Sequence, residues 1–204
     1  MAVTLERPAP PKPPPPQGGG DRGGEGRPEV RPPLRLFVWL VVAAVAMFFL
    51  GLSSALLARA GSAGWVPAPR PGVLWPGTFA LLVSSALLES GRRALARGEG
   101  ETGANRLRWG ALLGAGFLAG QVSAWRWLAG SGVGLASGPG AAYFYVLSGA
   151  HLLHVAGGLT WWLALLRRLR RPFGEVGVQL SGLAVYWHFL AGVWVWLFVL
   201  LFTR

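Results

Sequence analysis

The sequence predicts an all-α integral membrane protein with five transmembrane helices, an N-terminus in the cytoplasm and a C-terminus outside. Three observations lead to this fold class. Of the 204 residues, 52% are hydrophobic and only 13% are charged, which is typical of membrane proteins. Five apolar stretches each reach about 20 residues, enough to cross a hydrocarbon core of roughly 30 Å at 1.5 Å per residue. The arginines lie almost entirely between these stretches.

The chain is expected to consist of a tail and one membrane domain. Residues 1–35 combine a proline run at 13–16, glycines at 18–20 and charges of both signs. Such a segment buries too little apolar surface to fold, so we expect a disordered Pro/Gly-rich cytoplasmic tail. Residues 36–204 form the predicted five-helix transmembrane domain. Its helices are predicted at about 36–58, 73–96, 107–128, 142–166 and 176–202.

The orientation is predicted from the basic residues between the helices. Lysine and arginine alternate between rich and poor segments: six in the tail, two in the first loop, five in the second, one in the third, four in the fourth and one at the C-terminus. The positive-inside rule therefore places the N-terminus in the cytoplasm. The net charge of +11 is a topology signal for the same reason, and we expect no nucleic-acid partner.

Several kinds of active site are excluded by composition and pattern. The chain has no cysteine, which excludes disulfides, thiolate metal sites and cysteine nucleophiles. The sequence also offers no recognisable serine, histidine and acid set and no acid pair for hydrolysis. We therefore expect no catalytic residue in this chain.

The fourth apolar stretch carries two of the three histidines near its centre. His151 and His154 are three residues apart, so on a helix their side chains share one face at about 60° to each other. By helical rise, His154 lies about 18 Å and His188 about 17 Å from the cytoplasmic ends of their helices. A loop of about nine residues joins these helices, which predicts antiparallel neighbours and a common cluster of three imidazoles.

Three chemical interpretations of that cluster are open. His154 and His188 could ligate a haem iron from opposite sides, or the three histidines could bind a metal ion. In the third, neutral imidazoles hydrogen-bond to neighbouring groups and fix the helix packing. We prefer packing, with no cofactor or metal in this chain, because transmembrane haem proteins commonly use four histidines. The residues expected to provide these interhelical polar contacts are His151, His154, His188, Trp187, Ser84, Ser85 and Gln121.

Glu89 is the single acidic residue inside any of the apolar stretches. Arg92 and Arg93 follow it by three and four residues, a spacing that predicts an intrahelical ion pair at the membrane interface. A role in proton relay is the alternative interpretation for this group.

The last two apolar stretches resemble subunit III of the haem-copper oxidases. Residues 148–159, SGAHLLHVAGGL, resemble the family pattern of two histidines three apart followed by valine and glycines. Residues 186–189, YWHF, with the later Val-Trp and Leu-Phe pairs, resemble the last-helix signature. Weaker matches cover the other stretches, so the resemblance extends over about residues 36–203 and is closest to the short five-helix form. The weaker matches are Met47, Phe48, Phe49, Gly51, Thr78, Ser84, Ser85, Gly114, Ala115, Gly116, Phe117 and Gln121.

The chain departs from the family at three acidic positions. Apolar residues stand there instead: Val45 in the first helix, Ala124 in the third and Ala191 in the fifth. The resemblance therefore does not extend to the acids that are thought to support proton uptake by the catalytic subunit.

The resemblance implies a non-catalytic subunit III of a respiratory terminal oxidase. Its partners would be oxidase subunits I and II, which would hold the haem and copper, together with membrane phospholipids. The electron donor would be cytochrome c or a quinol, and the expected location is the prokaryotic plasma membrane. The alternatives are a stand-alone membrane carrier of haem b and a scaffold in another respiratory complex.

Overall fold

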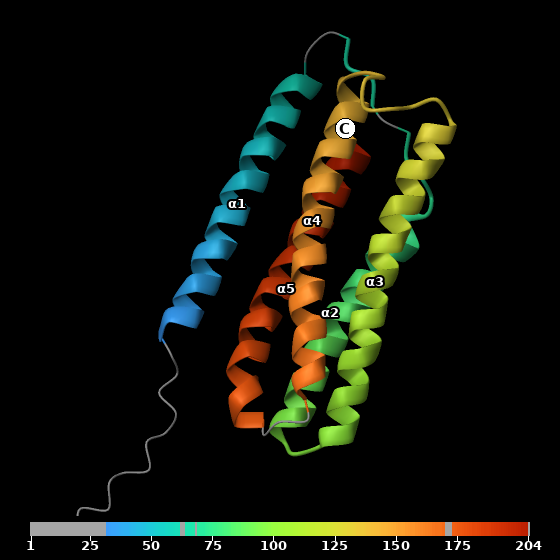
Figure 1. The fold of residues 1–204 in the computed structure, drawn as a ribbon. Helices are drawn as coiled ribbons and strands as arrows, with labels where there is room; N and C mark the ends of the chain where they lie inside the picture. The colour runs from blue at the N-terminus through green and yellow to red at the C-terminus, as the bar shows by residue number, and fades with distance from the viewer. Residues whose placement is uncertain (1–31, 62–63, 68, 170–172, 204) are drawn as a thin grey trace, which may run out of the picture. The chain divides into compact units, whose positions relative to one another are not determined.

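The computed structural model describes residues 32–61, 64–67, 69–169 and 173–203. Within them the fold is all-helical (Figure 1). Each predicted apolar stretch falls within one helix, apart from residue 73, and four of the helices extend beyond the predicted bounds by one to seven residues at each end. The helices are α1 (Pro32–Ala60), α2 (Leu74–Ala96), α3 (Gly100–Gly130), α4 (Pro139–Arg168) and α5 (Phe173–Thr203).

The helix starts follow from proline and glycine chemistry. α1 begins at Pro32, four residues before the predicted boundary, because a proline in the first turn has no N–H that the helix would use. α4 begins with Pro139 after Gly138, whose φ of 136° suits glycine. The predicted disordered tail falls mainly on residues 1–31, which lie outside the described residues.

A tight turn joins α2 to α3. Gly98 adopts a φ of 83°, and the Glu99 N–H donates to the carbonyl of Ala94 over 3.0 Å, which ends α2 in the manner of a glycine C-cap. Arg97 Nε lies 2.6 Å from Glu99 Oε1, and this guanidinium holds the pKa of the Glu99 carboxyl below its ordinary value. The turn therefore fixes α2 and α3 as antiparallel neighbours.

The helices pack around a central pair, α4 and α5. Among the described helices, the α5 backbone packs beside α1, α2 and α4, the α3 backbone beside α2 and α4, and the α1 backbone beside α4 and α5. The C-terminal ends of α2 and α4 lie at the same end of the bundle (Figure 1). α1 is therefore the least embedded helix of the five.

Glycines let bulky side chains and helix backbones approach closely. A Cβ atom on Gly114 would lie 2.8 Å from the Trp187 ring, and one on Gly110 would lie 2.9 Å from Trp162. The two indoles pack edge to face, with ring centroids 4.9 Å apart, a favourable geometry for aromatic pairs. Between α2 and α3, a Cβ on Gly91 would lie 3.1 Å from the Gly103 carbonyl oxygen. Gly103, Gly110 and Gly114 on α3 therefore leave room for the α2 backbone and for the indoles of α4 and α5.

Among the described residues, three helices are long and apolar enough to cross a membrane: Leu34–Ala60, Pro139–Arg168 and Val176–Thr203. α2 and α3 do not meet the same criterion. Both carry charged residues in the turns next to their connection, which lowers their average hydropathy. The three apolar helices identify a membrane protein.

Candidate functional site

His151 lies in an aromatic enclosure at the centre of the bundle. Its side chain is fully buried, and the imidazole stacks on Trp194 with ring centroids 5.1 Å apart. Phe49 of α1 and Phe117 of α3 pack against the ring at 6.1 and 5.8 Å. Neither ring nitrogen has a hydrogen-bond partner. The surroundings therefore favour a neutral ring held by packing, because burial of a charged imidazole without a counterion is costly.

His154 hydrogen-bonds within its own helix. Its Nδ1 lies 2.7 Å from the carbonyl oxygen of Ala150, and since a carbonyl only accepts, Nδ1 carries the proton. The Tyr186 hydroxyl on α5 donates to the His154 carbonyl over 3.3 Å. Phe49 packs on the imidazole at 5.6 Å. His154 thus joins α4 to α1 and α5.

His188 faces α2 and contacts a different set of groups. Its Nδ1 lies 2.5 Å from Ser85 Oγ, and its Nε2 lies 3.8 Å from Glu89 Oε2. Glu89 accepts hydrogen bonds from Arg92 Nε at 2.9 Å and Arg93 Nε at 2.6 Å. These five residues, which we name the α2/α5 polar cluster, combine one carboxylate with two guanidiniums on one side of the bundle.

The α2/α5 polar cluster brings a serine, a histidine and an acid together, a proximity that the sequence did not predict. Ser85 and Glu89 are four residues apart, so one face of α2 presents both to His188. The arrangement does not make a hydrolytic triad. The Glu89 carboxylate is occupied by two arginines, and 3.8 Å from Nε2 is too long for the hydrogen bond that orients a catalytic imidazole.

The predicted common cluster of three imidazoles is not formed. Trp194, which stacks on His151, follows His188 on α5 by six residues, so the two side chains are about 120° apart around the helix. His188 therefore points toward α2 while the α4 histidines point toward α1, α3 and another face of α5. In the described part of the chain, no group of three histidine or acidic side chains is arranged to hold a metal ion.

The α4–α5 interface does not fit a haem between His154 and His188. The Trp187 ring fills the space beside Gly158, where an added Cβ would lie 3.2 Å from it, and Tyr186 lies 3.1 Å from the same point. His154 Nδ1 is engaged by its own helix. A porphyrin needs an open slot between two facing imidazoles, whereas these two helices are in direct contact.

The remaining predicted polar residues lie inside the bundle. Ser84 Oγ donates to the Gly110 carbonyl over 2.7 Å and so joins α2 to α3. Gln121 is only 2% exposed, and its Oε1 has no partner. Trp187 is fully buried with its Nε1 unpartnered, so its contribution is the volume that it fills. Their functional role stays a proposal.

Three indole hydrogen bonds across helices were not predicted from the sequence. Trp194 Nε1 donates to Thr78 Oγ1 over 2.8 Å. Trp125 Nε1 donates to Ser148 Oγ over 3.0 Å. Trp196 Nε1 donates to Ser53 Oγ over 3.2 Å. A partial signal existed, since a buried indole N–H usually finds a hydroxyl or carbonyl, but the partner lies on another helix.

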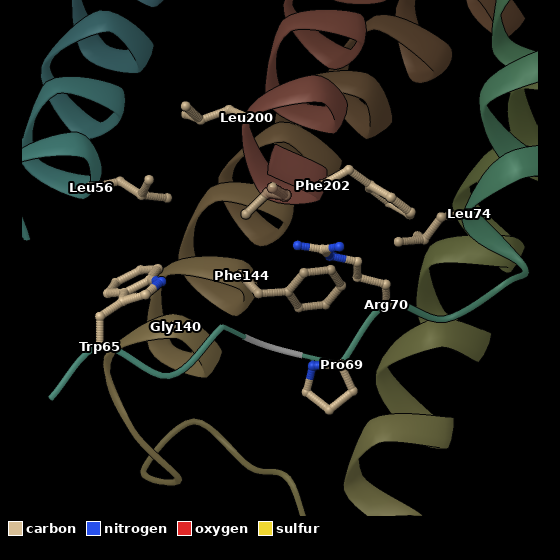
Figure 2. Close-up of a pocket in the computed structure, with 10 residues that line it drawn as sticks. Leu56, Trp65, Pro69, Arg70, Leu74, Gly140, Phe144, Leu200 and Phe202 are labelled. Carbon is tan, nitrogen blue, oxygen red and sulfur yellow. The ribbon is translucent and has the colours of Figure 1, made fainter. Parts of the chain in front are cut away.

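Two pockets differ in size and chemistry. Figure 2 shows the first, at the end of the bundle where Arg70 lies near Phe202, with the guanidinium carbon 5.7 Å from the ring centre. Its volume of about 20 Å³ suits a single water. The second, which we name the α1/α5 groove, has a volume of about 430 Å³ and a wholly apolar lining. Its lining residues are Ala46, Phe49, Leu50, Phe189, Gly192, Val193 and Trp196.

The three positions at which the resemblance expects acids all face the interior. Val45, Ala124 and Ala191 are 6%, 0% and 4% exposed. A carboxylate at any of them would be shielded from lipid and would have to find a partner inside the bundle. The apolar residues at these positions therefore add no charge to the interior of the bundle.

Known proteins are similar to this sequence over most of its length. It matches the family described as cytochrome c oxidase subunit III over residues 20–204. It is 36% identical to cytochrome c oxidase subunit 3 of a Synechocystis species over 84% of this chain and 76% of that protein. It is 34% identical to cytochrome c oxidase subunit 3 of Thermostichus vulcanus over 83% and 85% of the two chains.

A quinol-oxidizing enzyme provides a shorter match. The chain is 31% identical to cytochrome bo(3) ubiquinol oxidase subunit 3 of Pseudomonas aeruginosa over 45% of this chain and 44% of that protein. The family match over nearly the whole membrane domain agrees with the resemblance carried by the last two helices. The chain belongs to the cytochrome c oxidase subunit III family and has the subunit III role in a haem-copper oxidase, whose haem and copper reside in other subunits.

Proposed function

We propose that this chain is a non-catalytic scaffold which stabilises the catalytic subunit of a respiratory terminal oxidase in a prokaryotic plasma membrane. The observation that carries the proposal is the use of the interior histidines. His151 is enclosed by aromatic rings, and His154 bonds to its own helix. The space between α4 and α5 is filled by side chains. An interior of this kind supports packing and leaves the redox chemistry to partners.

We further propose that all five helices cross the membrane, with the N-terminus in the cytoplasm. α2 and α3 pack against α4 and α5 along the bundle, so they share its depth. The arginine-rich ends of α2 and α4 lie at the same end of the bundle, which supports a cytoplasmic location for that end. An odd number of spans then leaves the C-terminus outside.

The proposed partners are oxidase subunits I and II together with phospholipid. Relatives that share most of their length with the chain are named as subunits of cytochrome c oxidase, which supports cytochrome c as the electron donor of the complex. Phe48 on α1 and Leu153 on α4 are exposed apolar side chains. Such surfaces suit acyl chains, so we assign lipid contact to the open side of α1 and α4.

Copurification from native membranes tests the proposal. A tagged chain is purified in mild detergent, and its partners are identified by mass spectrometry while the optical spectrum of the complex is recorded. We expect oxidase subunits I and II and the absorption bands of their haems. Absence of a haem-copper catalytic subunit would overturn the scaffold role in a terminal oxidase. Haem retained by the isolated chain would instead favour the electron-carrier alternative.

A further inference from the structure

The structure points to the face of the bundle that binds the catalytic subunit. We propose that a transmembrane helix of that subunit docks on the surface formed by α5 with α1 on one side and α2 on the other. This docking face consists of the α2/α5 polar cluster and the α1/α5 groove. The inference rests on the proposed function, because it names the surface through which the scaffold acts.

His188 lies halfway along α5. The helix runs from Phe173 to Thr203, so about 22 Å of it lie on either side of His188. Its side chain is nevertheless 39% exposed on the surface of the isolated chain. A polar ring at the centre of a membrane helix faces protein or water far more often than acyl chains.

One ring nitrogen of His188 makes no hydrogen bond among the described residues. Ser85 engages Nδ1 of His188, but the nearest carboxylate oxygen, on Glu89, is 3.8 Å from Nε2, beyond hydrogen-bond distance. No other polar contact of Nε2 is found within the described ranges. In the tautomer in which Ser85 donates to Nδ1, the Nε2–H is a donor without an acceptor among the described residues. Acyl chains cannot supply one, so an unsatisfied donor is unfavourable in lipid.

The α2/α5 polar cluster carries a net charge. Glu89 is shared by Arg92 and Arg93, so the cluster carries one positive charge in excess with neutral histidine. Arg93 is 67% exposed and, near the end of α2, can extend toward the headgroups. His188 and Ser85 lie too deep for that. The chemistry that completes the cluster is therefore a protein acceptor at mid-depth, such as a hydroxyl or carboxylate on a neighbouring helix, followed by an acidic group nearer the cytoplasm.

The α1/α5 groove includes a glycine one turn of α5 away from His188. Gly192 follows His188 by four residues and so lies one turn farther along the same stripe of α5. An added Cβ on Gly192 would meet no atom within 4 Å, and this residue forms part of the α1/α5 groove. Small residues allow transmembrane helices to approach closely. The groove and the polar cluster are therefore continuous, and one helix can occupy the groove while bonding to His188.

Two glycines provide a matched test. Gly116 on α3 resembles Gly192 in being exposed with no atom within 4 Å of an added Cβ, but it lies off the docking face. We compare Gly192→Leu with Gly116→Leu in the native complex and measure haem recovered per tagged chain. We expect at least about a tenfold loss of the catalytic subunit for Gly192→Leu, as for a central interface position, and no loss for Gly116→Leu. Equal recovery from the two variants overturns the proposal.

A polar variant separates docking from folding. His188→Leu should lose the catalytic subunit, while His188→Gln, which keeps a side-chain donor, should retain more of it at the same amount of inserted chain. A photocrosslinking amino acid at position 192 should give an adduct with the catalytic subunit, and one at position 116 should not. An adduct at 192 with phospholipid alone would assign the groove to lipid and overturn docking. Failure of the wild-type chain to recover any haem-copper subunit would instead defeat the proposed function.

Discussion

Trp194 is shared by His151 and Thr78: its indole stacks on the imidazole at 5.1 Å and 27°, and its Nε1–H donates to the threonine hydroxyl over 2.8 Å. The contact connects α2, α4 and α5 through one side chain. Thr78 in turn donates to the Leu74 carbonyl over 2.8 Å. The interior thus contains one satisfied indole next to an imidazole that makes no hydrogen bond.

Replacing Thr78 tests the indole hydrogen bond. Thr78→Val keeps the shape of the side chain but leaves the buried Trp194 N–H without an acceptor. We expect a loss of about 1–3 kcal/mol in the free energy of unfolding, measured by denaturation of the purified chain in detergent. Thr160→Val is the matched control, because Thr160 is exposed and bonds only within its own turn. Equal losses in the two variants would contradict the importance of the Trp194 contact.

Replacing His151 tests the role of the unpartnered imidazole. His151→Leu removes two buried nitrogens without a partner while keeping an apolar group of similar volume. We expect the midpoint of thermal unfolding to stay the same or rise, because no hydrogen bond is lost and a desolvation penalty is removed. A fall of several degrees would show that the ring binds something that stabilises the fold.

Glycine substitutions on α3 test how closely the helices approach. Gly114→Ala places a methyl group 2.8 Å from the Trp187 ring, which is fully buried and has little room to move. We expect a loss of about 1–3 kcal/mol from overpacking. Gly116→Ala, in open space two residues away, should leave stability unchanged or raise it slightly. The midpoints of thermal unfolding of the two variants, measured under the same conditions, test this expected difference in stability.

The ion pairs of Glu89 with Arg92 and Arg93 are expected to make a small contribution to the free energy of unfolding. Glu89→Gln removes two guanidinium contacts on a partly exposed helix surface, so we expect a loss of about 0.5–1 kcal/mol that decreases as salt is added. Glu99→Gln removes a pair in the exposed turn and should change the unfolding midpoint less. A Glu89→Gln effect of several kcal/mol that does not depend on salt would mean that the carboxylate has an additional buried partner.

The helix positions could be predicted from the sequence because long apolar runs and flanking arginines are local features. The distance of His188 from the start of its helix was underestimated, at about 17 Å against about 22 Å, because α5 begins three residues earlier than predicted. Which side of α5 each residue faces could not be predicted. His188 and Trp194 are about 120° apart around the helix, and only the packing against α2 and α4 decides which of them meets His151.

The contacts between α2 and α5 could not be predicted either, because they join residues that are far apart in the sequence. Ser85 and His188 are separated by 103 residues, and Thr78 and Trp194 by 116. The Glu89 ion pairs could be predicted from the sequence because both partners lie in one helix, three and four residues away. The α1/α5 groove had no sequence signal, since a groove depends on the distance between two helix axes. Gly192 shows this limit, because its sequence neighbours do not distinguish it from a buried glycine.

The close approach of Gly91 and Gly103 has a consequence for how the polypeptide enters the bilayer during synthesis. Neither α2 nor α3 alone reaches the hydropathy expected of an autonomous span, yet a Cβ on either glycine would press within about 3 Å of the partner backbone. The two helices are therefore expected to leave the translocon together as a preassembled pair. A chain truncated before α3 should then fail to retain α2 in the membrane.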